Sequence, residues 1–357
     1  MMYKHDYLYD FTKRVFLKMG CSREHSEIIA DVFLAAELRG HASHGMIRIK
    51  DYYDLWKAAR INVSPEIRIV HESPSTAVVD GDNGIGMVAA RKSMEIAIEK
   101  AENAGTGWVA TRNSNHFGIA GYYSMMALKH DMIGICLTNA NPLVAPTFSI
   151  SRMMGTNPVA VAIPALEQPP FVADFATTPI ARGKLAVAEK KGEKVAFGFV
   201  QDKTGKPSDD PSILKSGGSM LTLGGDRLHG SHKGYCLSAI VDIFSALFSG
   251  ANFGPFVPPS VAYLPVLGKK VGEGTGHFFG AMRIDAFQSP WDFKTKMDEW
   301  IGTFRSAIPA EGEERVLIPG DPERESEQRI MKEGIKLVPA IKDDLVIIAR
   351  ELGISFE

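Results

Sequence analysis

The chain has 357 residues, of which 45% are hydrophobic, and its formal charge is -2. That length supports a large buried core in one large domain or two, and the near-neutral charge gives no reason to expect nucleic acid or an anionic membrane as a partner. No apolar run reaches the ~18 residues that span a bilayer, the first residues do not resemble a secretory signal, and the three cysteines form no CxxC site or disulfide framework. We therefore expect a cytoplasmic protein.

Helices are predicted at both ends of the chain. Apolar residues recur at helical spacing over 8–19 and 28–36, and a third helix is expected over 43–59 with Ser43 as its N-cap. Residues 341–352 carry one apolar stripe. We expect this last helix to pack against the first ones, because chain ends often lie close together.

The middle of the chain mixes strands and helices. A helix is predicted over 87–104, and β-branched runs predict strands at 76–80, 107–111, 133–138, 159–164, 171–175 and 195–199. This mixture favours an α/β domain. The predicted organisation is a helical region at 1–70, an α/β domain at 71–305, and a segment at 306–357 that returns to the helices.

One glycine-rich turn resembles a dinucleotide-binding motif. The tract Gly84-Ile85-Gly86-Met87-Val88-Ala89 fits G-x-G-x-x-A between a predicted strand and a predicted helix. A Rossmann fold would place an acidic residue at the end of the next strand, where Thr111-Arg112-Asn113-Ser114 has none. Because three small residues are a weak signal in a chain with 34 glycines, we interpret the tract as a tight turn that begins a helix.

Polar residues gather at the start of the third predicted helix. On a helix that begins at Ser43, the side chains of His44, Arg48 and Tyr52 share one face. Arginine binds a carboxylate through two parallel hydrogen bonds, and histidine titrates near neutrality and transfers protons. The group suits a substrate with a carboxylate and a hydroxyl, and a solvated polar face is the alternative.

Three further positions are candidates for ligand contacts. His116 stands in a turn before a Gly/Ala-rich helix start, where backbone N–H groups can bind a phosphate; a capped turn is the alternative. Asp174, at a strand end, suits a ribose hydroxyl, a catalytic partner or a cap. Lys233 precedes a helical run and suits a pyrophosphate, or is simply solvated. The histidine pairs of the chain lack an HExxH pattern, so no catalytic metal is expected.

Taken together, the motifs resemble those of the malate/L-lactate/L-sulfolactate dehydrogenase family, which also contains ureidoglycolate dehydrogenase, diketogulonate reductase and a cyclic-imine reductase. The ordered set covers nearly the whole chain and comprises residues 39–45, 114–118, 155–158, 232–235, 276–280 and 317–320. The resemblance implies an α/β fold whose nicotinamide-binding domain is not a Rossmann fold, and a helical domain formed by both chain ends. It also implies a homodimer with active sites near the subunit contact.

The resemblance further implies roles for single residues. Arg48 corresponds to the carboxylate-binding arginine, Thr156 to a substrate contact, Ser43 and His44 to a proton-transfer pair, and His116 to the proton acceptor. The positions that match cofactor contacts are His116, Phe117, Gly118, Ile119, Ala120, Asp174, Phe175, Ala176, Arg182, Gly183 and Lys233. No carboxylate matches the one proposed to complete a relay with Ser43 and His44 in the imine reductase, and Glu189 is nearby but out of register.

We therefore predict hydride transfer between a nicotinamide cofactor and a small 2-hydroxy or 2-oxo acid. Malate is preferred, then lactate or sulfolactate, and the variable tract 139–142 leaves the choice open. NAD is preferred over NADP, because only Arg112 and Arg182 are candidates for a 2′-phosphate. Tyr52 is predicted to bind substrate, His116 to accept the proton, and His44 to orient the substrate or relay through Ser43. The alternatives are NADPH-dependent reduction of a cyclic imino acid and, more remotely, a non-catalytic small-molecule binder.

Overall fold

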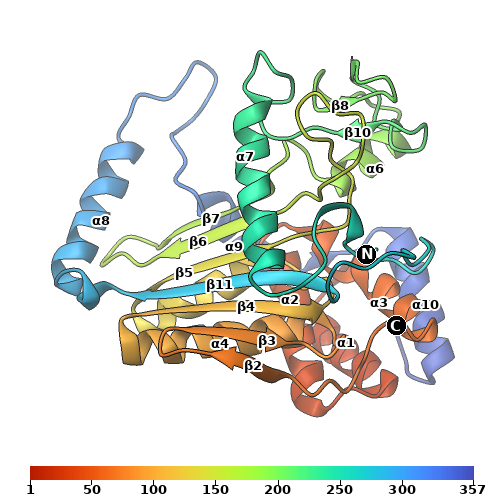
Figure 1. The fold of residues 1–357 in the computed structure, drawn as a ribbon, viewed down its shortest axis with the longest axis horizontal. Helices are drawn as coiled ribbons and strands as arrows, with labels where there is room; N and C mark the ends of the chain where they lie inside the picture. The colour runs from red at the N-terminus through yellow and green to blue at the C-terminus, as the bar shows by residue number, and fades with distance from the viewer.

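A computed structural model describes the backbone of residues 1–357 and every side chain except that of Lys190. Its centre is a seven-stranded sheet in the order β2-β3-β4-β11-β5-β6-β7 (Figure 1). The strands are β2 (Arg68–Glu72), β3 (Thr76–Asp80), β4 (Thr106–Ser114), β5 (Met132–Thr138), β6 (Val159–Ile163), β7 (Phe171–Phe175) and β11 (Thr275–Arg283). Within this sheet β3 and β4 are parallel and the other neighbours are antiparallel. Such a sheet is not the doubly wound parallel sheet of a Rossmann fold, so the predicted non-Rossmann α/β fold is confirmed.

Both faces of the sheet are covered. On one face, Phe279 belongs to the main core together with α4 (Gly86–Ala104) and α5 (Ala120–Met126). On the other, Phe278 packs with Val241 of α7 (Ser231–Asp242), which continues into a π-helix at Ile243–Leu247. Successive side chains of a strand point to opposite faces, so β11 contributes to both layers.

The two chain ends form a helical group beside the sheet. It contains α1 (His5–Met19), α2 (Arg23–Leu38), α3 (Ile49–Lys57) and α10 (Pro339–Leu352). Helix α10 contacts α1 and α3, β1 (Met2–Tyr3) pairs with β12 (Ile335–Lys336), and both termini lie on this side of the molecule in Figure 1. Phe11 and Phe33 share one continuous core with Val109 of β4, so the helical group packs directly on the sheet.

A smaller layer projects from the far side of the sheet and has a core of its own. It is built from α6 (Arg182–Lys191) and the short sheet β10-β8-β9, with β8 at Val200–Gln201, β9 at Pro207–Ser208 and β10 at Ser219–Met220 (Figure 1). The strand predicted at 195–199 is wrong, because β8 begins only at Val200. The core residues of this layer are Val144, Met154, Leu185, Val200, Ile213 and Met220.

The remaining elements lie at the edges of the molecule. Helix α8 (Pro290–Arg305) stands at one end of the sheet, and α9 (Asp321–Glu333) packs against α2. Short helical turns occupy Ala42–His44, Met46–Arg48, Ala127–His130, Gly254–Phe256 and Ile284–Ala286. None of the helices in the described part of the chain has the length and apolar character that a membrane crossing demands.

Candidate active site

The turn that carries His116 rests directly on the glycine-rich tract. A Cβ added at Gly86 would lie 2.1 Å from the carbonyl oxygen of Asn115 and 2.4 Å from that of His116. The Asn115 amide also donates to the carbonyl of Gly84 at 2.8 Å. The tract therefore needs glycine so that the start of α4 and the His116 turn can approach closely. This is a physical reason for the G-x-G-x-x-A pattern that involves no nucleotide.

The helix predicted over 43–59 is present only as α3, and its predicted start at Ser43 is wrong. Two short turns, Ala42–His44 and Met46–Arg48, precede α3, and Ser43 lies inside the first turn instead of capping a helix. The interruption comes from Glu37 of α2, whose buried carboxylate accepts the Met46 N–H at 2.7 Å. A Cβ at Gly45 would lie 2.2 Å from that carboxylate. Sequence reasoning missed Glu37, although an acidic residue among the apolar residues 28–38, which also include Asp31, was the available signal.

The structure brings the predicted proton-transfer residues together. The rings of His44 and His116 stack with their centroids 5.4 Å apart and an interplanar angle of 17°. The Ser43 hydroxyl lies 3.0 Å from His44 Nδ1, and the Tyr52 hydroxyl lies 2.8 Å from His116 Nδ1. His44 and Tyr52, which the spacing placed on one face, thus both contact His116, although the backbone between them is not one helix. Tyr52 directs its hydroxyl to His116.

Arg48 stands beside this pair and has one buried nitrogen atom without a partner among the described residues. Its Nη1 is 2.8 Å from Asp51 Oδ2, and its Nη2 donates to the Ser260 hydroxyl at 3.2 Å. Its Nε is buried and has no hydrogen-bond partner among the described residues. A buried donor without an acceptor is costly, and a bound carboxylate would satisfy it.

Burial and positive neighbours keep both histidines neutral. The pKa of His116 is held well below its ordinary 6.5 by burial first, then by Arg48, His44 and His277. The pKa of His44 falls to about 3 through burial and the charge of Arg48. The near-neutral titration of an ordinary histidine therefore does not apply to either residue. At neutral pH both rings are bases that can accept a proton.

A third histidine, which is fully buried and was missed by sequence reasoning, holds the residue next to His116. His277 of β11 bonds Ser114 through Nε2 and Thr138 through Nδ1, both at 2.7 Å. Its ring stacks on Phe117 at 4.6 Å and 12°, and burial lowers its pKa to about 3. His277 therefore ties the His116 turn to three strands. The motif at residues 276–280 was the signal for it.

The predicted cofactor positions divide into buried and accessible groups. Asp174 is bonded to the N–H of Gly121 at 2.7 Å, so it caps α5, and that N–H is not free for a phosphate. Burial raises the pKa of Asp174 against the effects of His41, the Gly121 N–H and Arg39. The side chains of Phe117, Ile119 and Ala120 are buried. Phe175, by contrast, is exposed, and Ala176 is half-buried.

Two predicted cations lie at the starts of helices in the outer layers. Arg182 begins α6 and donates to the Tyr263 hydroxyl at 2.6 Å. The next residue, Gly183, lies against Ser43, since a Cβ there would be 2.9 Å from the Ser43 Cβ. Lys233 lies in the first turn of α7, is exposed, and makes no ion pair among the described residues. The start of α6 therefore adjoins the segment that carries Ser43.

The variable tract 139–142 is placed next to Thr156. Asn157 accepts the Ala140 N–H at 3.2 Å and donates to the Ser238 carbonyl at 3.1 Å. The Thr156 carbonyl accepts the Thr177 N–H at 2.9 Å, and its side chain is half-buried. Glu189, considered for a relay with Ser43, instead pairs with Lys215 on the surface.

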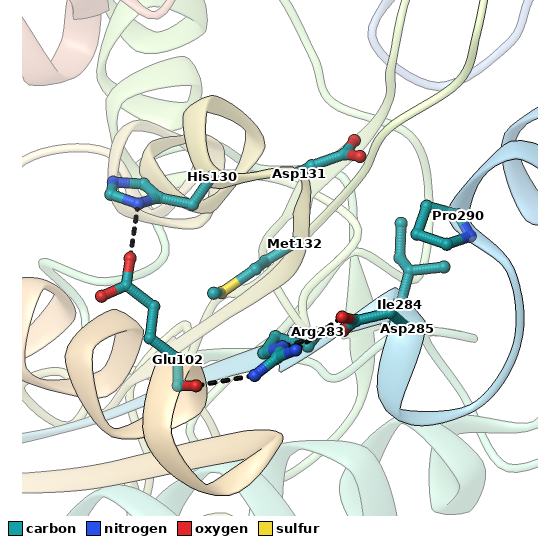
Figure 2. A pocket seen from close by; sticks show the side chains of 8 residues that line it. All are labelled: Glu102, His130, Asp131, Met132, Arg283, Ile284, Asp285 and Pro290. Atoms are coloured by element: carbon teal, nitrogen blue, oxygen red, sulfur yellow. Dashed lines mark hydrogen bonds and ion pairs between the residues drawn. The ribbon is translucent and has the colours of Figure 1, made fainter.

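A cavity of about 340 Å³ lies away from these residues (Figure 2). It is lined by Met132 at the start of β5 and Arg283 at the end of β11, whereas Ser114 and Thr138, near His116, lie at the opposite strand ends. Figure 2 shows contacts among most of its charged groups. Arg283 pairs with Asp285 and donates to the Glu102 carbonyl, and the Glu102 carboxylate lies 3.0 Å from His130 Nδ1. The cavity is therefore separate from the candidate site.

Known proteins of one family are similar to this chain over almost its entire length. The sequence profile of the family described as malate/L-lactate dehydrogenase matches residues 3–346. The chain is 40% identical to a malate dehydrogenase of Pyrococcus abyssi over 98% of its own length and 94% of the relative's. The structure of a sulfolactate dehydrogenase from Methanocaldococcus jannaschii superposes with a TM-score of 0.90 at 39% identity, covering 99% of this chain and 98% of that one. A malate dehydrogenase from Pyrococcus horikoshii gives a TM-score of 0.91 at 37% identity, covering 100% and 97%. The chain belongs to the malate/L-lactate dehydrogenase family.

Proposed function

We propose that this chain transfers a hydride between NAD(H) and a small 2-hydroxy or 2-oxo acid, with malate and oxaloacetate as its preferred pair. The observation that carries the proposal is the buried, unpartnered Nε of Arg48 beside two neutral, stacked histidines. The Arg48 Nε can donate to a carboxylate, and a neutral histidine can accept a proton. A 2-hydroxy acid presents both functions on adjacent carbons. The relatives named malate and sulfolactate dehydrogenase support this substrate class.

The roles follow from where each group lies. Arg48 binds the substrate carboxylate, which fixes C2 and its hydroxyl near the imidazoles. His116 accepts the hydroxyl proton during oxidation, and His44 orients the substrate or relays the proton through Ser43. The negative substrate also offsets the charge of Arg48, so substrate binding raises the pKa of His116 from its depressed value and makes proton transfer easier. Thr156 is a further proposed substrate contact.

Two basic side chains at helix starts are suited to binding a dinucleotide cofactor. Arg182 and Lys233 lie at helix starts, where backbone N–H groups and the helix dipole also favour a pyrophosphate. Arg112, a candidate for a 2′-phosphate, is already paired with Asp80 at 3.1 Å, which supports NAD over NADP. When bound, the oxidised nicotinamide supplies the acceptor for the hydride on C2.

We also propose a homodimer. Apolar side chains are exposed on α7, on the π-helix that follows it and at the residue after that, a surface suited to association. They are Tyr235, Ile240, Ile243, Leu247 and Phe248. Sedimentation should give the mass of two chains, and Leu247→Glu should shift it toward one. A monomeric wild-type protein with full activity would exclude this proposal.

The test of the activity is NADH absorbance with a panel of oxaloacetate, pyruvate, sulfopyruvate and cyclic imino acids. We expect turnover with the 2-oxo acids and the highest kcat/KM with oxaloacetate. Preferred turnover of a cyclic imine with NADPH would replace the proposal by imine reduction, and no turnover with tight ligand binding would indicate a binder. Arg91→Lys is a matched control for variants of Arg48, because Arg91 pairs with Glu95 on the surface of α4.

A further inference from the structure

The hydroxyl of Tyr52 makes two hydrogen bonds to the same residue. Tyr52 is 1% exposed, and its hydroxyl oxygen lies 2.6 Å from the carbonyl oxygen of His116 and 2.8 Å from its Nδ1. A phenol has one proton to donate. The carbonyl oxygen can only accept, so the shorter contact requires the phenol proton. The phenol oxygen is then left with lone pairs facing Nδ1, and that contact is a hydrogen bond only if Nδ1 carries the proton.

Two neighbouring features bear on this assignment. Burial raises the pKa of Tyr52, so the phenol keeps its proton at neutral pH. The N–H of Gly118 also points toward His116 Nδ1 and would favour an unprotonated Nδ1, but at 3.4 Å it is a much longer contact than the phenol at 2.8 Å. While the phenol is present, the shorter contact prevails.

We propose that Tyr52 is the positioning residue that holds neutral His116 as the Nδ1–H tautomer and so leaves Nε2 free to accept the substrate proton. The inference rests on the proposed function for its catalytic meaning, while the tautomer itself rests on geometry alone. In the oxidation, the substrate O–H bond breaks and an Nε2–H bond forms, while the hydride on C2 leaves to the oxidised nicotinamide. The resulting imidazolium keeps its Nδ1–H on the phenol oxygen, so Tyr52 also stabilises the charged form.

Removing the hydroxyl should reverse the tautomer. In Tyr52→Phe the Gly118 N–H is the remaining contact of Nδ1, and an N–H can only donate. Nδ1 should then become the acceptor and Nε2 should carry the proton, which blocks Nε2 as a base. The matched control is Tyr53→Phe, because Tyr53 is the next residue of α3, is similarly buried, and donates to Glu351 at 2.7 Å instead of to a histidine.

The direct test is nitrogen NMR of the ¹⁵N-histidine-labelled protein at neutral pH, with the His116 signals assigned by their loss in His116→Gln. We expect Nδ1–H in the wild-type protein and in Tyr53→Phe, and Nε2–H in Tyr52→Phe. An Nε2–H tautomer in the wild-type protein would overturn the proposal. This wild-type measurement decides even if Tyr52→Phe fails to fold, and it needs no activity, so a failure of the proposed function shows itself separately in the substrate panel.

Kinetics give the second readout. We expect Tyr52→Phe to lower kcat by roughly 10–100-fold, up to the lower limit of the ~10²–10⁴-fold range for general acid–base help, while KM for the 2-oxo acid and NADH affinity change little. Tyr53→Phe should leave kcat near the wild-type value. An unchanged kcat in Tyr52→Phe, or a rise in KM alone, would contradict a positioning role and would favour direct substrate binding by Tyr52.

Discussion

The buried carboxyl group of Glu37 should make the stability of the protein depend on pH. The residue is 6% exposed and its carboxyl group contacts Gly45 and Met46; burial raises the pKa of that carboxyl from 4.5 to about 7, partly offset by the Met46 N–H. Between those two pH values the folded protein holds a proton that the unfolded chain has released. Stability must therefore fall as the pH rises through this window. A shift from 4.5 to about 7 corresponds to a loss of ~3 kcal/mol.

The perturbation is Glu37→Gln, which keeps an oxygen for the Met46 N–H but cannot ionise. We expect the variant to gain stability relative to the wild-type protein as the pH rises, by up to ~3 kcal/mol between pH ~4.5 and ~8. Chemical denaturation of both proteins across this range measures the difference. The buried histidines His44, His116 and His277 make the folded protein less stable as the pH falls below about 6.5. This effect is common to both proteins, so it cancels in the stability difference between them.

A matched control distinguishes this effect from a general change in charge. Glu351 is an exposed carboxylate whose pKa is lowered by Lys57 and Tyr53, so Glu351→Gln should lose stability relative to the wild-type protein as the pH rises, the opposite direction. A stability difference between Glu37→Gln and wild type that stays constant from acid to alkaline pH would contradict a raised pKa of Glu37. It would mean that Glu37 is ionised throughout and that water or a neighbour compensates its burial.

The remaining predictions concern the site itself. Gly86→Ala should destabilise the protein by ~1–3 kcal/mol through overpacking against backbone oxygens, and it should lower kcat by displacing His116. Gly302 has open space around it on α8, so Gly302→Ala should change neither stability nor kcat. Melting curves and steady-state kinetics of both variants measure these effects. Arg48→Lys loses the planar fork and should lower kcat/KM by ~1.5–3 kcal/mol without changing NADH affinity, measured by steady-state rates and titration. Because the pKa of His116 is depressed, the ring stays in its basic form at mildly acidic pH. The kcat/KM for the hydroxy acid should therefore stay constant as the pH falls from 7 past 6.5, and it should decline only at lower pH. His116→Ala should remove that decline and lower kcat by at least ~10²-fold, whereas His44→Ala should mainly raise KM; loss of the decline in His44→Ala instead would exchange the two roles.

Local pattern determined much of the fold. The elements β3 and β7 occupy the predicted residues, α4 begins one residue before its predicted start, and α10 packs on α1 and α3. In each, the spacing of apolar residues over a few turns or strand positions carries the signal. The grouping of His44, Arg48 and Tyr52 also came from spacing, and the family was evident from its ordered motifs.

Other features depended on contacts between distant residues. The central strand β11 was not predicted as a strand, and its residues were identified only as part of a motif. Its residue His277 pairs with Thr111 and Thr138, which lie more than a hundred residues earlier in the chain, and no local pattern reports such pairing. The break at Gly45 depends on Glu37 reaching across from another helix. The tautomer of His116 depends on a phenol that belongs, in sequence, to the helix that was expected to bind substrate. Local sequence specifies many of the helices and strands, but burial, a shared proton and a close backbone approach arise only where the folded chain brings distant atoms together.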